Sequence, residues 1–225
     1  MSFDRRTRIE QMRKADRARD RRTRVLVISL SAVVVAGLVG FGAYTLVDRA
    51  DSSADRKASD AKNAEQSAAE KEELAKGTIS GEKTWDAKKL TRNHVTKTVT
   101  YPMKPPVGGD HSPVWMNCDG EVYEKAIPDM NAVHALEHGS VWVTYTDKAS
   151  AADVDKLAER VSTTPYSLMS PYKDQAGAIM LSAWGKQVTV DSADDRRVAQ
   201  FFAKYVQGPQ TPEPGAACTG GRATP

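Results

Sequence analysis

The chain has 225 residues, 40% of them hydrophobic, and a formal net charge of +3. This length fits one domain of ordinary size with accessory segments. Residues 1–24 carry ten Arg or Lys against four Asp or Glu, a charge of +6, which leaves −3 for the rest of the chain. A basic tail of this kind is compatible with nucleic-acid binding, but the apolar segment that follows it favours a membrane protein instead.

That apolar segment, residues 25–47, contains no charged residue. Its length at about 1.5 Å per residue spans the roughly 30 Å hydrocarbon layer of a bilayer. It is too long for the apolar region of a cleaved signal peptide, about 7–15 residues. The positive-inside rule keeps the arginine-rich tail in the cytoplasm and predicts a single-pass plasma-membrane anchor. Residues 48–225 are then extracytoplasmic, and residues 25–47 and the basic tail contact lipid rather than nucleic acid.

Residues 48–76 consist mostly of Ala, Asp, Glu, Lys, Ser and Gln. Such a segment has too few large apolar side chains to bury a core. It predicts a spacer, either a charged helical stalk or a disordered linker, and residues 70–76 are its most helix-prone part.

The composition changes at Gly77, and residues 77–208 are expected to form one α+β domain, because strand and helix patterns mix without regular βαβ alternation. A Pro/Gly-rich tail, residues 209–225, follows. Strands are predicted at residues 78–80, 95–101, 122–123, 141–145, 178–184 and 187–190. Helices are predicted between Asn131 and Gly139, after the Ser150-x-x-Asp153 cap, and between the Ser192-x-x-Asp195 cap and Gly208.

Cys118 and Cys218 are the two cysteines of the chain. Both fall on the extracytoplasmic side of the predicted anchor, where disulfides persist. A redox or metal-thiolate pair is the alternative, but the chain has no Cys-x-x-Cys motif and no basic neighbour that would activate a thiol. We therefore predict a Cys118–Cys218 disulfide that ties the tail to the domain.

The short helix from Asn131 to Gly139 carries the main candidate site. Asn131 is a favourable helix cap, and Gly139 suits a helix end because glycine enters the left-handed region at little cost. His134 and His138, four residues apart, are expected to project from one face. The other two histidines, His94 and His111, lie upstream in the same domain.

These histidines support a metal-site hypothesis. His111, His134 and His138, with His94 as a further ligand, would offer imidazole nitrogens to Zn(II) or Cu(II). Glu137 would act as a second shell that fixes one tautomer. The Pro/Gly-rich loop at residues 105–111 is too poor in large apolar residues to be ordered by burial alone, so an ion would also explain its order. The best function from the sequence is a metal-binding accessory protein.

Two alternatives remain open. In the first, the histidines are structural, and an envelope-binding or scaffolding module presents Trp115, Trp142, Trp184 and Tyr123 to a wall component or a partner protein. In the second, His134-x-x-Glu137-His138 is the inverted zinc-peptidase signature with Glu137 as general base. Two turns of helix are a poor platform for a hydrolase and no third ligand is marked downstream. A role without catalysis is therefore favoured, and no catalytic residue is assigned.

Several separated motifs resemble a known family. They are Pro105-Pro106-x-Gly108-Gly109-x-His111, Trp115, Val133-His134-Ala135-Leu136-Glu137-His138-Gly139, Ala183-Trp184-Gly185 and the Cys218 tail. Their order is similar to that in actinobacterial membrane-anchored proteins with a single domain of unknown function marked by the VHALEHG core. The resemblance covers roughly residues 77–221 and implies an extracytoplasmic α+β domain. It brings no established activity, cofactor or catalytic residue.

Overall fold

The computed structural model describes residues 60–225, and the predicted membrane segment at residues 25–47 lies outside that range. Within residues 60–225, no helix is both long enough and apolar enough to cross a membrane. Residues 60–76, the C-terminal part of the predicted spacer, are helical. The chain divides into two units, Met1–Gln66 and Ser67–Pro225, and all the elements described below belong to the second.

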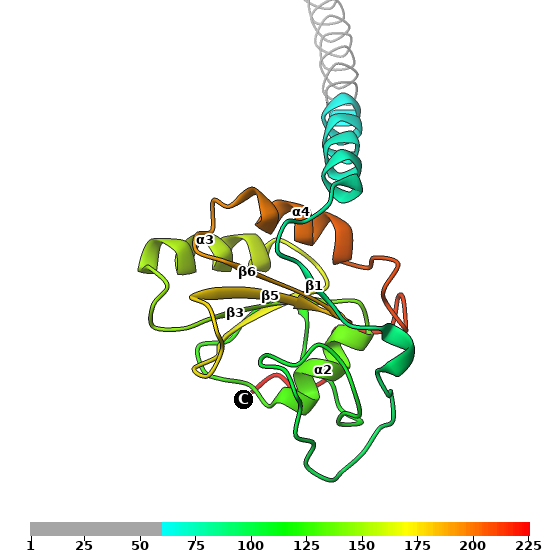
Figure 1. The fold of residues 1–225 in the computed structure, drawn as a ribbon. Coiled ribbons are helices and arrows are strands. Elements are labelled where there is room, and N and C mark those ends of the chain that lie inside the picture. Colours follow the sequence, from blue (N-terminus) through cyan, green and yellow to red (C-terminus); the bar gives the residue numbers. More distant parts are fainter. Residues whose placement is uncertain (1–59) are drawn as a thin grey trace, which may run out of the picture. The chain divides into compact units, whose positions relative to one another are not determined.

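A six-stranded mixed sheet in the order β1-β6-β5-β3-β4-β2 forms the centre of this unit (Figure 1). The strands are β1 (Lys83–Thr84), β2 (Asp119–Val122), β3 (Val141–Tyr145), β4 (Ser167–Pro171), β5 (Ile179–Ala183) and β6 (Lys186–Val190). The pairings of β4 with β3 and with β2 are parallel, and the other pairings are antiparallel.

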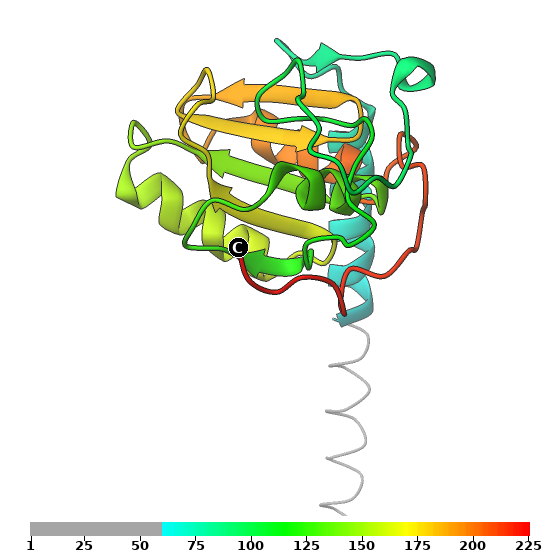
Figure 2. The ribbon, with the colours of Figure 1, turned by 90° about the horizontal axis from the view of Figure 1, so that it is seen from below.

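Helices cover both faces of the sheet. They are the 3-10 helix η1 (Ala87–Lys89), α2 (Asp129–Glu137), α3 (Ala151–Ser162) and α4 (Arg196–Tyr205). Figure 1 shows α3 and α4 on one face and α2 on the other. Figure 2 looks at the sheet from the α2 side, where α2 and the long loops before it lie in front of the strands.

The two faces bury two separate cores, as the alternation of side chains along a strand requires. Val141 and Val143 of β3 point into the core under α3 and α4, together with Phe201. Trp142, between them in the sequence, points into the core under α2. The central strand is therefore buried on both faces, which explains its continuous run of apolar residues.

The α+β class is confirmed, and so are several local predictions. The strand at residues 141–145 forms, and the apolar run at residues 178–184 pairs with its predicted partner as the β5–β6 hairpin. Ser150 caps α3 by accepting a hydrogen bond from the Asp153 amide. The cap of α4 is Asp195, whose side chain accepts a hydrogen bond from the Arg197 amide. The helix therefore begins about one turn later than the predicted cap Ser192.

Two strand predictions were wrong. Residues 78–80 form a turn before β1, and residues 95–101 form an extended loop outside the sheet. In that loop Tyr101 is buried and Val99 is partly buried in the α2-side core, so its alternation reports burial without strand pairing. The β4 strand was not predicted, because the serines at residues 167 and 170 interrupt its apolar pattern although both are fully buried. With β3 and α3 this strand completes one parallel βαβ unit.

The predicted disulfide is confirmed. Cys118 and Cys218 are bonded, with their Cα atoms 4.8 Å apart and a sequence separation of 100. Beside the bond, the Cys118 amide donates to the Cys218 carbonyl at 2.9 Å. The tail runs past the C-terminal end of α2, where the Glu213 amide donates to the Glu137 carbonyl at 3.1 Å. The disulfide thus closes a tail over the helix that carries the candidate site.

We expect the double variant Cys118→Ser/Cys218→Ser to lose about 2–5 kcal/mol of unfolding free energy, because the bond restrains a long loop in the unfolded chain. Urea denaturation of the oxidised proteins measures the loss. The matched control is Thr219→Ala, an exposed change next to Cys218 that should stay within about 0.5 kcal/mol of the parent. An unchanged midpoint in the double variant would contradict the expectation.

Candidate metal centre

Helix α2 is short and almost completely enclosed, with all residues from Asn131 to Glu137 buried. The helix begins at Asp129 after Pro128, about half a turn before Asn131, which was the predicted cap. Asn131 therefore lies inside the helix. The Asn131 side chain has a different use. Its Nδ2 donates to the Val114 carbonyl at 2.6 Å and to the Ser112 hydroxyl at 3.2 Å. These bonds attach the loop that follows His111 to the helix that carries His134.

The C-terminal end of α2 follows the prediction. His138 is the C-cap, and Gly139 has a φ of 93°, in the left-handed region. A Cβ atom at Gly139 would lie 2.5 Å from the Gln207 Nε2 atom and 2.8 Å from the Thr211 side chain, so space as well as conformation requires glycine there. The helix therefore ends in a tightly packed turn, covered by the chain that follows α4.

The loop at residues 105–111 is ordered by burial together with hydrogen bonds inside the protein. Val107 is fully buried, and Gly108 packs against the Trp184 ring. Asp110 Oδ1 accepts from the Asn93 amide at 3.1 Å and from Asn93 Nδ2 at 2.9 Å. The loop thus has an explanation that needs no ion, and the case for a metal must come from the histidines themselves.

A short parallel bridge brings His94 beside His111. The His111 amide donates to the Asn93 carbonyl at 3.0 Å, and the Val95 amide donates to the His111 carbonyl at 2.7 Å. The two imidazole rings lie with their centroids 5.0 Å apart. Two histidines from separate loop segments are therefore held at one point over α2.

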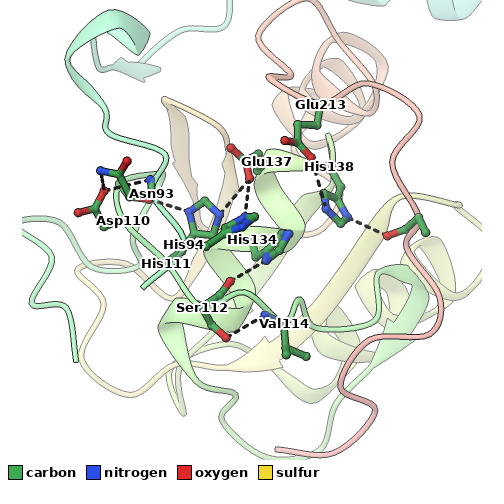
Figure 3. Close-up of polar contacts among 12 residues, drawn as sticks. Asn93, His94, Asp110, His111, Ser112, Val114, His134, Glu137, His138 and Glu213 are labelled. Carbon is green, nitrogen blue, oxygen red and sulfur yellow. Dashed lines mark hydrogen bonds and ion pairs between the residues drawn. The ribbon is translucent and has the colours of Figure 1, made fainter. Parts of the chain in front are cut away.

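His94, His111, His134 and Glu137 gather at that point (Figure 3). Each offers one ligand atom, and these four atoms all lie within 4.8 Å of one another. His111, His134 and Glu137 are buried, whereas the His94 side chain is 44% exposed. The cluster is thus enclosed on the α2 side and open to solvent at His94.

Hydrogen bonds from the Nδ1 atoms orient the two buried rings. His111 Nδ1 donates to the Gly109 carbonyl at 2.8 Å, and His134 Nδ1 donates to the Ser112 carbonyl at 2.7 Å. Metal-binding histidines usually donate one ring N–H to such an acceptor, which fixes the tautomer and leaves the other nitrogen for the ion. Both rings therefore present Nε2 toward the cluster.

His111 and Glu137 form a buried ion pair. His111 Nε2 lies 2.9 Å from Glu137 Oε2, and both partners of His111, a carbonyl and a carboxylate, can only accept hydrogen bonds. Burial by itself lowers the pKa of His111, but the bonds to Glu137 and Gly109 and the Glu137 charge outweigh it, so the net pKa is raised. Burial raises the pKa of Glu137, and the His111 bond and charge more than reverse this, so its net pKa is lowered.

His134 and His138 are held neutral. Burial lowers the pKa of His134 to about 4, with smaller contributions of the same sign from the other three histidines. Burial also lowers the pKa of His138. Metal ions bind the neutral form of imidazole. A histidine with a lowered pKa is in that form near neutral pH and can bind a metal ion there.

His138 stands next to the cluster and faces another way. Its ring centroid is 4.6 Å from that of His134, but its Nδ1 donates to the Ala217 carbonyl at 2.7 Å and its Nε2 lies 4.0 Å from Glu213. His138 keeps a helical φ of −72°, so it is these contacts with the tail, and not a change of backbone at His138, that accompany the different direction of its ring. The fourth ligand atom of the cluster comes from Glu137, three residues after His134, and not from His138.

The four residues therefore differ from the predicted set in one exchange. His94, His111 and His134 come together as the hypothesis requires, His138 faces the tail, and Glu137 lies among the candidate ligands where a second shell was expected. This geometry does not fit the inverted zinc-peptidase interpretation, which needs His134 and His138 as ligands and Glu137 as a free base. The spacing of three between His134 and Glu137 was the signal in the sequence for the observed arrangement.

The comparisons with known proteins give a family without a function. Residues 94–220 match the family described as a protein of unknown function, DUF3105, and this match covers more than half of the chain. The chain belongs to the DUF3105 family. All four residues of the cluster and both cysteines lie inside the matched range. No curated protein and no solved structure matched the chain significantly.

The lowered pKa of His134 predicts an acid-sensitive domain. In the unfolded chain His134 binds a proton below a pKa of about 6.5, whereas in the folded chain it does so only near pH 4. The free energy of unfolding therefore falls as the pH drops from about 6.5 to about 4. For the metal-free protein, this group alone should remove about 2 kcal/mol of unfolding free energy between pH 7.5 and pH 5. His111, whose pKa is raised, has the opposite sign, so the two contributions must be separated.

Comparison of the parent with His134→Gln separates them. Glutamine does not titrate and can still donate to the Ser112 carbonyl, so the variant should lose about 2 kcal/mol less than the parent over the same pH range. Urea denaturation in the presence of a chelator at both pH values gives the two slopes. Equal pH dependence in both proteins would show that His134 titrates normally in the fold.

Proposed function

We propose that this domain binds a transition-metal ion, Zn(II) or Cu(II), through His94, His111, His134 and Glu137. The observation that carries the proposal is the convergence of four ligand atoms within 4.8 Å of one another. Three imidazole nitrogens and a carboxylate oxygen suit both ions, which accept nitrogen and oxygen donors. The ion would lie over α2, between that helix and the loops that carry His94 and His111.

The outer contacts support this assignment. The Ser112 and Gly109 carbonyls hold the His134 and His111 rings with Nε2 directed inward, as second-shell acceptors do in metal sites. The proton between His111 Nε2 and Glu137 occupies the place where an ion would bind both atoms. Binding would release that proton, because only a deprotonated nitrogen is a ligand.

The spacing needs a small closure. In a tetrahedral shell, two ligand atoms that are each about 2.1 Å from the ion lie about 3.4 Å from each other. Ligand atoms of the cluster that are up to 4.8 Å apart must therefore approach by about 1.4 Å. The half-exposed His94 side chain is the ligand with room to supply this movement by rotation.

The chemical role follows from the ligand count. Four protein ligands fill a tetrahedral zinc shell, the pattern of sites that hold an ion, whereas catalytic zinc keeps a position for water. We therefore propose an accessory protein that carries or senses metal and assign no catalytic residue. The DUF3105 family brings no activity that would argue for another role.

A second candidate is a binding or scaffolding module with structural histidines. One observation favours it: both ring nitrogens of His111 already have protein partners, Gly109 and Glu137. On this alternative the ion pair only fastens the 105–111 loop to α2. The two functions differ in whether added metal displaces the pair.

Metal binding is tested with the purified full-length chain. We expect about one Zn(II) or Cu(II) per chain by elemental analysis, and His134→Gln or Glu137→Gln should weaken binding at least tenfold, since even loss of a second-shell partner costs about 10–100-fold. His138→Gln is the matched control. It changes a buried histidine at the end of the same helix that lies outside the ligand set, and it should leave the affinity within about threefold of the parent.

Circular dichroism and the intact disulfide confirm that each variant folds. If the parent holds no ion, the structural-histidine alternative replaces the metal proposal. If His138→Gln weakens binding as much as His134→Gln, the ligand set is the one that the sequence first suggested, and the arrangement in Figure 3 is not the binding arrangement.

We further propose that the domain lies outside the cytoplasm on a single-pass anchor at residues 25–47, with the basic tail inside. The arginine-rich segment before an uncharged apolar run supports this orientation. The Cys118–Cys218 disulfide also supports it, because such bonds persist in oxidising compartments.

The orientation predicts the behaviour of reporters fused after Pro225. Alkaline phosphatase, which needs an oxidising compartment, should be active there, and a reporter that works only in the cytoplasm should be silent. Removal of residues 1–24 provides the control, since it deletes the positive charges that orient the segment. Activity of the cytoplasmic reporter in the full-length fusion would refute the topology.

A further inference from the structure

His94 differs from the other three candidate ligands in exposure and support. Its side chain is 44% exposed, whereas those of His111 and Glu137 are 0% and 2% exposed. Within residues 60–225, no hydrogen bond holds the His94 ring, and its contact with Glu137 is an Nε2 to Oε2 distance of 3.6 Å. The buried three are each fixed by a hydrogen bond, and His94 is not.

The His94 ring is also not oriented to bind the same ion as the His134 ring. It stacks on the His134 ring, with centroids 4.6 Å apart and planes only 23° apart. The lone pair of an imidazole nitrogen lies in the ring plane, so an ion in the plane of one stacked ring is well out of the plane of the other. To bind the ion that His134 binds, the His94 ring must turn out of this stack.

The backbone allows such a turn. On either side of His94, the Asn93 carbonyl accepts from the His111 amide at 3.0 Å and the Val95 amide donates to the His111 carbonyl at 2.7 Å. Rotation about the side-chain bonds of His94 therefore moves the ring between the stack and the ion while the loop stays in place. The His94 side chain thus has room to turn on a fixed backbone, whereas hydrogen bonds hold the side chains of His111, His134 and Glu137.

A cleft lined by chain neighbours of three candidate ligands gives an incoming group room. It has a volume of about 730 Å³ and is lined by three segments that each adjoin a candidate ligand, residues 95–99 after His94, residues 112–113 after His111, and residues 127–131 before His134. Its lining includes Ser112, whose carbonyl holds the His134 ring. The four ligands themselves do not line the cleft, so the exposed side of His94 would be the point of entry for an external side chain held there.

We propose that His94 is an exchangeable ligand and that the site accepts an external imidazole, the histidine side chain of a metal donor or acceptor, in its place. This inference rests on the proposed metal binding and adds to it that the ion is passed on through the His94 side. In the exchange one metal–nitrogen bond to His94 breaks and one to the incoming imidazole forms, with no change in oxidation state. His111, His134 and Glu137 keep the ion during the step.

Chemical rescue with free imidazole tests the proposal. Co(II) serves as a spectroscopic probe for the zinc position in the full-length chain. His94→Ala should weaken Co(II) binding at least about tenfold, and millimolar imidazole should restore most of that affinity and a visible spectrum close to that of the parent. His134→Ala is the matched control, because its position is 3% exposed and closed to an external ring. Imidazole should restore nothing in that variant.

The outcomes separate the two proposals. If the parent binds no Co(II), Zn(II) or Cu(II), the proposed function fails, and the exchange proposal fails with it. If the parent binds but imidazole restores neither His94→Ala nor the more open His94→Gly, metal binding stands and the exchange proposal is overturned. Equal rescue of His134→Ala would also overturn it, because the His94 side would then have no special access.

Discussion

The structure around the site depends on one buried carboxylate. Glu137 sits at the end of α2 with 2% of its side chain exposed, and a buried ionised group is costly unless it has a close partner. His111 is that partner, and it can reach Glu137 only if the loop before it folds over the helix. The Asn93 and Asp110 contacts hold that loop and at the same time bring His94 to the same point. One ion pair thus accounts for the convergence of residues from three separate segments.

The tail completes the enclosure of the same helix. Nine residues of α2, most of them buried, have the sheet on one side and need a cover on the other. The disulfide anchors the tail that covers α2. The Ala217 carbonyl in this tail accepts a hydrogen bond from the His138 ring, which therefore faces the tail and not the cluster. This explains why His138 and Glu137 exchange the roles that the sequence suggested. Which of two polar residues faces inward was decided by partners about 80 residues away, which local spacing does not reveal.

The sequence predicted the parts of the fold that local patterns determine. The β3 strand, the β5–β6 hairpin, the Ser150 cap and the Gly139 helix end each follow from apolar alternation or from capping chemistry within a few residues. The β4 strand was missed because its buried serines are satisfied by tertiary hydrogen bonds, such as that from Trp142 Nε1 to Ser170, and so resemble loop residues in the sequence. The strand prediction for residues 95–101 was wrong in the opposite sense, a strand predicted where none forms. The alternation of these residues reflects the packing of a loop on the core.

Charge balance links the buried and the open halves of the site. A divalent ion held by three neutral imidazoles and one carboxylate would leave a net charge of +1 among the four ligands. In a fully enclosed cavity that charge would be strongly disfavoured, because solvation is lost and the ligand set contributes a single carboxylate. The exposure of His94 would allow water to stabilise the charge from one side, so in the proposed site the opening at His94 would favour binding as well as exchange. A variant that covered His94 with apolar side chains would close the route and lose this solvation together, so affinity and exchange rate should fall in parallel.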